Sequence, residues 1–209
     1  TDTMAYVTAA DKADRENGKY VFDSTYAGNV LSGNIAGNGS LVLKLYFKLN
    51  TAPWTVEYYY DDVKGDAPQG AATGGTGTIG TQASVTPAAG VTMGGKTYAL
   101  DYTENNPLVI AVSGNVISVY YATDEIGEKD PDEPDQIPDK YQVTILYQSV
   151  DTSLGTVGAL TKEVKTILVS GKWAENGSVA ISGSTATATA GYFSGWSAAQ
   201  AGHTGWSDD

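Results

Sequence analysis

Residues that could carry out hydrolytic chemistry are scarce in this sequence. The only histidine, His203, lies six residues from the end, in a glycine-containing run that offers nothing to orient it as a base. There is no cysteine, which excludes thiolate nucleophiles, disulfides and thiolate zinc sites. The acids that glycoside hydrolysis requires fall mostly in turns or in a linker, and the glycines of 70–80 lack the Lys-Ser/Thr ending of a phosphate-binding loop. The sequence therefore predicts a protein that is not an enzyme.

Hard oxygen ligands are concentrated in one acidic, proline-containing segment. Four aspartates fall within ten residues, a residue type that suits Ca²⁺: Asp130, Asp132, Asp135 and Asp139. The segment lacks the ordered Asp-x-Asp-x-Asp-Gly spacing, and its prolines restrict loop closure. Two interpretations stay open, a calcium site formed by these four carboxylates or an acidic spacer that needs no cofactor.

Tyrosines offer a second kind of candidate site. Tyr46 and Tyr120 occupy equivalent, outward-facing positions of two predicted strands, and Tyr58 and Tyr60 share one face of a third. Aromatic rings of this kind stack on ligands as well as on each other. We predict that these four tyrosines bind a glycan; the alternative is that they pack in a core or pair across a sheet face.

The overall charge limits the class of partner. The chain carries 24 acidic and 12 basic side chains, which gives a formal net charge of −12. Nucleic acid and anionic membrane surfaces are therefore excluded as expected partners on electrostatic grounds. No apolar stretch is long enough to span a bilayer, so we expect a signal or an anchor only in parts of the protein outside this sequence.

The elements that must position these residues are mainly strands. Odd-numbered positions of 41–49 form one apolar face, and 117, 119 and 121 repeat the pattern with Ser118 and Tyr120 outward. Residues 141–147 and 163–169 also read as strands, 11–17 as a short helix, and the Gly/Thr/Ala-rich run 65–83 as a mobile loop. The predicted fold class is β-rich α+β.

An internal repeat sets the domain organisation. Residues 6–10, 18–20, 22–23 and 41–47 match 84–88, 95–97, 100–101 and 115–121, with an offset of 74 to 78 residues. We therefore predict a first module at 1–50 and a second module at 54–124. The composition then changes to acids and prolines at 125–139, which predicts an extended linker, here called the acidic segment. A third module is predicted at 140–209.

The two copies are not equally complete. The second module opens with the strand-forming run at 54–60, for which the first module has no counterpart. A sheet that lacks a strand exposes an unpaired edge. Either the sequence starts part-way through a repeat, or a neighbouring subunit donates the missing strand and the protein self-associates.

These motifs resemble a known family of surface proteins. The aromatic strand 54–60, Gly77-Thr78-Ile79-Gly80, Gly95-Lys96-Thr97-Tyr98 and the closing Val119-Tyr120-Tyr121 resemble the MucBP-like (mucin-binding-protein) repeats of Gram-positive surface adhesins. The start of the third module at 137–144 resembles a module that follows such repeats. Its end at 190–197 is similar to the closing motif of internalin B-type and Listeria–Bacteroides repeats.

The resemblance implies a fold, a location and a partner. It implies tandem ubiquitin-like β-grasp modules in an elongated array, extracellular and attached to the cell surface or cell wall through parts outside this sequence. It further implies an adhesin segment that binds host mucin-type glycoprotein. Two alternatives stay open: a structural spacer or strand-exchanging, self-assembling subunit, and an accessory module of a secreted carbohydrate-active enzyme.

Overall fold

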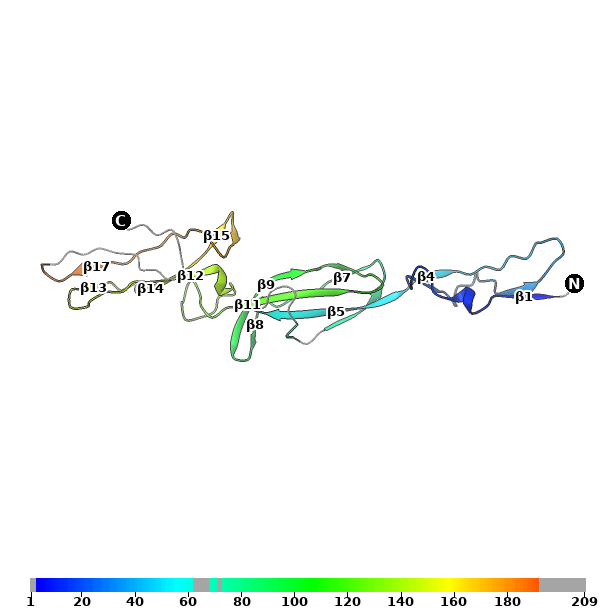
Figure 1. The fold of residues 1–209 in the computed structure, drawn as a ribbon, viewed down its shortest axis with the longest axis horizontal. Coiled ribbons are helices and arrows are strands. Elements are labelled where there is room, and N and C mark those ends of the chain that lie inside the picture. Colours follow the sequence, from blue (N-terminus) through cyan, green and yellow to red (C-terminus); the bar gives the residue numbers. More distant parts are fainter. Residues whose placement is uncertain (1–2, 62–67, 71–72, 192–209) are drawn as a thin grey trace. The chain divides into compact units, whose positions relative to one another are not determined.

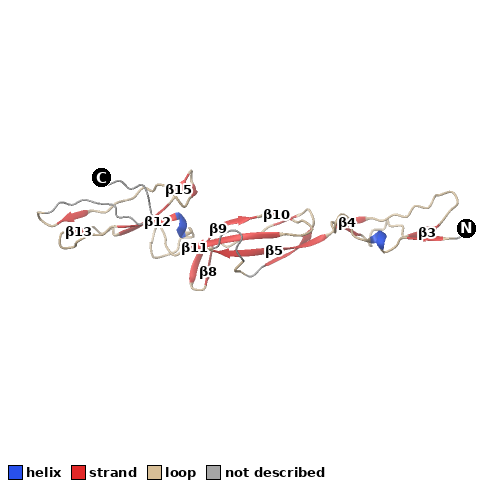
Figure 2. Ribbon diagram, viewed as in Figure 1, coloured by secondary structure: helices blue, strands red, loops and turns tan. Residues whose placement is uncertain are grey.

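The computed structural model describes residues 3–61, 68–70 and 73–191. Strands dominate these residues, and helix is confined to two short 3-10 turns, η1 (Ala10–Lys12) and η2 (Asp139–Tyr141) (Figures 1 and 2). The β-rich prediction is therefore confirmed. The helix predicted over 11–17 is wrong beyond the turn η1, because Arg15 already pairs with Tyr20 to begin a β-hairpin.

The first module consists of two small antiparallel pairs. Strand β1 (Met4–Tyr6) pairs with β3 (Ser32–Asn34), and β2 (Tyr20–Phe22) pairs with β4 (Phe47–Leu49). The strand predicted over 41–49 is therefore shorter than expected, although its odd positions up to 47 are less exposed than its even ones. None of the described residues of 3–50 is buried. Two-stranded sheets without a buried core are only marginally stable in water.

A five-stranded sheet forms most of the second module. It contains β5 (Thr51–Tyr60), β6 (Thr73–Thr78), β8 (Gly90–Met93), β9 (Lys96–Glu104) and β11 (Val116–Thr123), in the order β6-β5-β11-β9-β8 (Figure 1). The pairs β5–β6 and β8–β9 are antiparallel. Strands β5 and β11 run parallel, because Thr55 and Asp61 donate their N–H groups to Asn115 and Tyr121 with the same separation along both strands.

Strand β11 lies at the centre of this sheet and is buried on both faces. Six consecutive residues, 117–122, are buried. The expectation that Ser118 and Tyr120 point to solvent is therefore wrong, because side chains cover both faces of β11 and not one. A second cluster of buried residues, Ala52, Ile79, Ala83 and Ile110, packs with Trp54.

The glycine-rich run at 65–83 is not the loop that its composition suggested, so far as the structure describes it. Residues 73–78 form the strand β6 beside β5, and β7 (Gln82–Ala83) pairs with β10 (Leu108–Val109). A side chain at Gly74 would run into the backbone of Trp54, and the indole of Trp54 lies over Gly75. Glycine here permits the close approach of two strands.

Equivalent strands of the two copies have equivalent neighbours. Under the sequence offset, β1 and β3 correspond to β7 and β10, which are paired, and β2 and β4 correspond to β9 and β11, which are adjacent. The N–H of Asn50 donates to the carbonyl of Lys19 at 2.9 Å, and the N–H of Asp124 donates to Thr97 at 2.9 Å. These two hydrogen bonds align Lys19 with Thr97 and therefore Tyr20 with Tyr98, whereas the sequence repeat aligned Tyr20 with Thr97. Strands β5 and β6 have no counterpart in the described part of the first module.

The third module contains three further strand pairs. Strand β12 (Gln142–Leu146) pairs with β14 (Lys162–Thr166), β13 (Gly155–Val157) with β17 (Ala186–Ala188), and β15 (Leu168–Val169) with β16 (Lys172–Trp173), all antiparallel. The strand predicted over 141–147 is confirmed, and the one over 163–169 divides into β14 and β15. Among residues 140–191, the buried apolar side chains are those of Tyr147, Val164 and Ile167.

By their contacts the residues separate into two compact units. One comprises Thr1–Tyr58, Pro68–Thr86 and Thr103–Val119, and the other Tyr59–Ala67, Pro87–Tyr102 and Tyr120–Asp209.

Candidate functional site: an aromatic surface beside an open sheet edge

The first module displays a pair of stacked tyrosines at its surface. The ring centroids of Tyr26 and Tyr46 are 4.3 Å apart with a 41° interplanar angle, and the residues are 49% and 40% exposed. Asn29 fixes the backbone of both. Its Oδ1 accepts the N–H of Tyr46 at 3.0 Å, and its Nδ2 donates to the carbonyls of Tyr26 and Asp23. An exposed aromatic surface with a fixed backbone can receive a flat apolar or aromatic group.

Charged groups flank this pair. The carboxylate of Asp23 accepts the hydroxyl and the N–H of Thr25, and the Nζ of Lys48 lies 3.4 Å from it. The hydrogen bond from the Thr25 hydroxyl is the main cause that lowers the pKa of Asp23, so this carboxylate is ionised at neutral pH. The site therefore offers an aromatic surface, an anion and a cation to a ligand.

Tyr120, the predicted equivalent of Tyr46, is in a different environment. It is 3% exposed, and its ring is stacked between Tyr102, at 4.3 Å, and Tyr59, at 4.8 Å. The expectation that the Tyr120 ring faces solvent is wrong, because β5 supplies Tyr59 as a cover on one side of the ring. Ligand binding by Tyr120 stays a prediction. Tyr46 has one such neighbour among the described residues, Tyr26.

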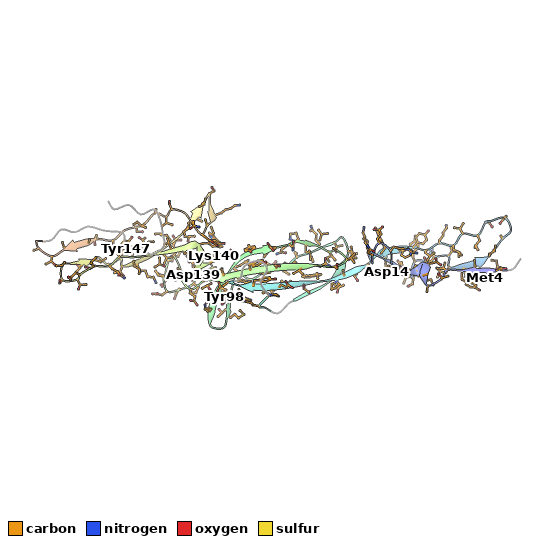
Figure 3. The ribbon with its side chains drawn as sticks, in the orientation of Figure 1. Met4, Asp14, Tyr98, Asp139, Lys140 and Tyr147 are labelled. Carbon is orange, nitrogen blue, oxygen red and sulfur yellow. The ribbon has the colours of Figure 1, made fainter. Side chains whose placement is uncertain are left out.

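Tyr58 and Tyr60, on β5, are half-buried. Tyr60 stacks on Tyr121 with centroids 5.5 Å apart and meets Tyr98 edge-on at 5.2 Å. Tyr98 is labelled in Figure 3. Gly70 packs against the side chain of Tyr58. Both tyrosines thus make intramolecular packing contacts in the second module, and glycan binding by them stays a prediction.

The edge of β4 that faces away from β2 is the other part of the candidate site. Tyr46 accepts the N–H of Asp23, and Asn50 donates to Lys19, so positions 46, 48 and 50 direct their backbone groups toward β2. Because neighbouring residues of a strand alternate, Phe47 and Leu49 direct theirs to the opposite edge. No strand is paired with that edge among the residues that the structure describes.

The acidic segment is a folded loop and not the extended linker that its charge suggested. Three carboxylates hold backbone N–H groups across it. Asp124 accepts from Asp135 and Gln136, Asp139 accepts from residues 125 and 126, and Asp135 accepts from Glu128. These charge-assisted bonds outweigh the mutual repulsion of the acids. Asp124 is fully buried, and this burial raises its pKa in spite of the two N–H donors.

The four predicted calcium ligands do not share one coordination sphere. Asp135 and Asp139 engage backbone N–H groups, Asp130 accepts the N–H of Asp132, and Asp132 lies 3.4 Å from Lys162. Within residues 3–61, 68–70 and 73–191, no three His, Cys, Asp or Glu side chains are grouped so that they could hold a metal ion. Calcium binding stays a prediction, and it would require these carboxylates to exchange protein donors for the cation.

A buried carboxylate in the third module was not anticipated from the sequence. Glu163 accepts hydrogen bonds from the Tyr147 hydroxyl and from the N–H groups of Ser182 and Gly183 (Figure 3 labels Tyr147). Burial alone would raise its pKa, but these donors lower it to about 2. The residue anchors the 182–183 turn to β14. No sequence pattern indicated this burial, because positions 163 and 165, which share one face of the predicted strand, are both charged.

Several predicted features lie outside the described residues. These are His203 and, except for its first two residues, the closing motif at 190–197. None of the described helices has the length and apolar character needed to cross a membrane. No known protein family, characterised protein or solved structure matches this chain. A functional assignment therefore rests on the residues and their geometry.

Proposed function

We propose that this chain is a non-enzymatic stalk segment of an extracellular bacterial surface protein, in which repeated β-modules hold neighbouring parts away from the cell. The single observation that supports this most is the correspondence of strand pairs between the first and second modules, with β2–β4 matching β9–β11. Repetition of one small β-unit is typical of chains that serve as spacers. Attachment to a Gram-positive cell wall, through parts outside this sequence, belongs to the same proposal.

The finer fold assignment, tandem β-grasp modules, is also a proposal. It is supported by the sheet of the second module. Its first and last strands in chain order, β5 and β11, are parallel neighbours inside the sheet, as the first and last strands are in ubiquitin-like sheets. The described residues contain no α-helix to cross this sheet; β7 and its flanking loops occupy that stretch of the chain instead.

Antibody labelling of intact cells tests the stalk proposal. An antibody raised against this chain should label unpermeabilised cells of the source bacterium, and brief protease treatment of intact cells should remove the label. Labelling that requires permeabilisation would contradict an extracellular location. Small-angle scattering of the isolated chain provides the second test, since a stalk requires a maximum dimension well above that of a compact protein of its mass.

A second candidate function, adhesion to host mucin-type glycan, is favoured by the exposed Tyr26–Tyr46 pair and its charged neighbours. Binding of the chain to immobilised mucin tests it. We expect Tyr46→Ala to abolish saturable binding, and Tyr120→Phe, a conservative change at the buried equivalent, to leave it unchanged.

A further inference from the structure

A buried amide oxygen lies beside the acidic segment without a hydrogen-bond donor. Gln142, the first residue of β12, is 8% exposed, and its Oε1 atom is buried with no hydrogen-bond partner. The Nε2 atom of the same amide donates to Oδ2 of Asp135 at 3.0 Å, so the amide lies directly against a carboxylate of the acidic segment. Burial of an unpaired amide oxygen is unfavourable, and such an atom in a folded protein indicates a ligand that completes its bonding.

The carboxylates next to this amide lack a cation. Asp124 is fully buried, and its two oxygens accept the N–H groups of Asp135 and Gln136 at 3.1 and 2.9 Å. Within the part of the chain that the structure describes, no basic side chain is paired with Asp124 or Asp135. A carboxylate removed from water is stabilised most strongly by a positive charge in contact with it.

Both carboxylates have lone pairs left for a metal ion. A carboxylate offers about four lone-pair sites, and Asp124 uses one on each oxygen. Asp135 accepts the N–H of Ile137 on Oδ1 and those of Glu128 and Gln142 on Oδ2. Rotation of the Gln142 amide by half a turn would bring Oε1 to the position, 3.0 Å from Oδ2 of Asp135, that Nε2 now holds. Two oxygens at that separation repel each other unless a cation binds both.

Backbone carbonyls provide further oxygen ligands close to Asp135. A methyl group on Gly127 would overlap the carbonyl oxygen of Glu133, and it would lie 3.0 Å from the carbonyl oxygen of Asp130 and 3.3 Å from Cβ of Asp135. The two carbonyls and the aspartate therefore converge on one point of the loop. Carboxylate, amide and carbonyl oxygens together are the ligand types of calcium sites.

We propose that Asp124, Asp135 and Gln142 form a calcium site, in which Oε1 of Gln142 turns toward Oδ2 of Asp135 and loop carbonyls or water complete the coordination. The site retains Asp135 of the four aspartates predicted from the sequence and replaces the other three by a buried carboxylate and an amide. Only the hydrogen bond from Nε2 of Gln142 is given up, because the backbone N–H groups keep their acceptors.

The bound ion fastens the acidic segment to β12. Residues 125–139 carry seven acids and one lysine, and calcium offsets part of this charge at the point where the segment meets Gln142. The site has two carboxylates, in agreement with the absence of any suitable group of three acidic or histidine side chains among the described residues. The proposed stalk function does not use these residues, so the two proposals are tested separately.

Calcium titration of the complete, chelator-treated chain is the first measurement. Calorimetry should show one-to-one binding with a Kd of about 0.1 to 1 mM, as for sites with few charged ligands. In NMR spectra, the side-chain amide of Gln142 and the backbone amide of Glu128 should shift with the same Kd. Mg²⁺ should bind at least about tenfold more weakly, because it demands a near-ideal octahedron. An equal response to Mg²⁺, or to Na⁺ at matched ionic strength, would overturn the proposal by showing general screening of acidic charge.

Two substitutions that remove the same charge locate the site. Asp135→Asn should weaken calcium binding at least about tenfold, because a shared carboxylate ligand is lost. Asp132→Asn changes a side chain of the same segment that is 90% exposed, and it should leave the Kd unchanged. Equal losses for the two variants would overturn the proposal, since they would show that calcium is attracted by the net charge of the segment and not by this site.

Gln142→Glu tests the site by a gain of affinity. Without calcium, the new carboxylate repels Asp135, so we expect a lower Tm in the presence of chelator. With calcium, both carboxylates bind the ion, and the Kd should fall about tenfold while calcium raises Tm by more than it does in the unaltered chain. Unchanged or weaker calcium binding by this variant would overturn the proposal. So would the absence of binding by the unaltered chain at about 10 mM calcium, ten times the weakest Kd expected.

Discussion

Substitution of the two equivalent tyrosines provides the sharpest test of the asymmetry between the modules. Tyr120 is 3% exposed and is flanked by two rings at 4.3 and 4.8 Å, whereas Tyr46 is 40% exposed with a single ring at 4.3 Å. Removal of a buried aromatic side chain costs about 3 to 5 kcal/mol through lost burial and the cavity that remains. We therefore expect Tyr120→Ala to lower the free energy of unfolding of the second module by about 4 kcal/mol.

Tyr46→Ala removes a half-exposed ring with one stacking partner, and such a pair contributes about 0.5 to 1.5 kcal/mol. We expect a loss of about 1 kcal/mol, confined to the first module. Urea unfolding of each variant, followed by hydrogen exchange of the β4 and β11 amides, separates the two modules. Equal losses for the two substitutions would refute the reasoning, because they would mean that Tyr46 is covered as fully as Tyr120.

The remaining predictions concern three carboxylates, Glu163 of the third module and Asp124 and Asp101 of the second. Hydrogen bonds lower the pKa of Glu163 from 4.5 to about 2 in the folded protein. The ionised carboxylate therefore contributes fully to the free energy of unfolding above the unfolded-state pKa, and this contribution is lost as the pH falls toward the folded-state pKa. By linkage it amounts to at most about 3 kcal/mol, so the free energy of urea unfolding of the third module should fall between about pH 5 and pH 2, and Glu163→Gln should flatten this dependence. An equally steep profile in the variant would assign the pH dependence to other groups. Asp124→Ala leaves the N–H groups of Asp135 and Gln136 without their buried acceptor, and we expect a loss of about 2 kcal/mol with faster exchange of both amides. Unchanged exchange there would mean that water replaces the carboxylate. Burial lowers the pKa of Lys140, but the ion pair with Asp101 raises it by more (Figure 3 labels Lys140). Asp101→Asn should therefore lower the pKa of Lys140, which NMR titration of the ammonium group measures. An unchanged titration would show that the 2.7 Å contact is not maintained in solution.

Much of the strand content followed from the sequence alone. Alternation and β-branched or aromatic residues predicted strands at 54–60, 115–121 and 141–147, because these patterns depend only on the two-residue period of a strand. The structure has them as β5, β11 and β12. The offset between the copies likewise identified Tyr46 and Tyr120 as a matched pair. Comparison of the two copies also showed that the strand at 54–60 has no counterpart within residues 1–50.

The exposure of each tyrosine was decided by the tertiary structure. Tyr46 and Tyr120 have nearly the same local sequence, and only the presence of β5 beside β11 buries one of them. The same holds for the glycines of β6, which form a strand because Trp54 and its neighbours offer a partner, and for the acidic segment, whose carboxylates find backbone N–H groups across a loop. Local sequence determined the period and the turns of this protein. Which faces are covered depends on contacts between residues far apart in the chain, and those exist only once the sheet has formed.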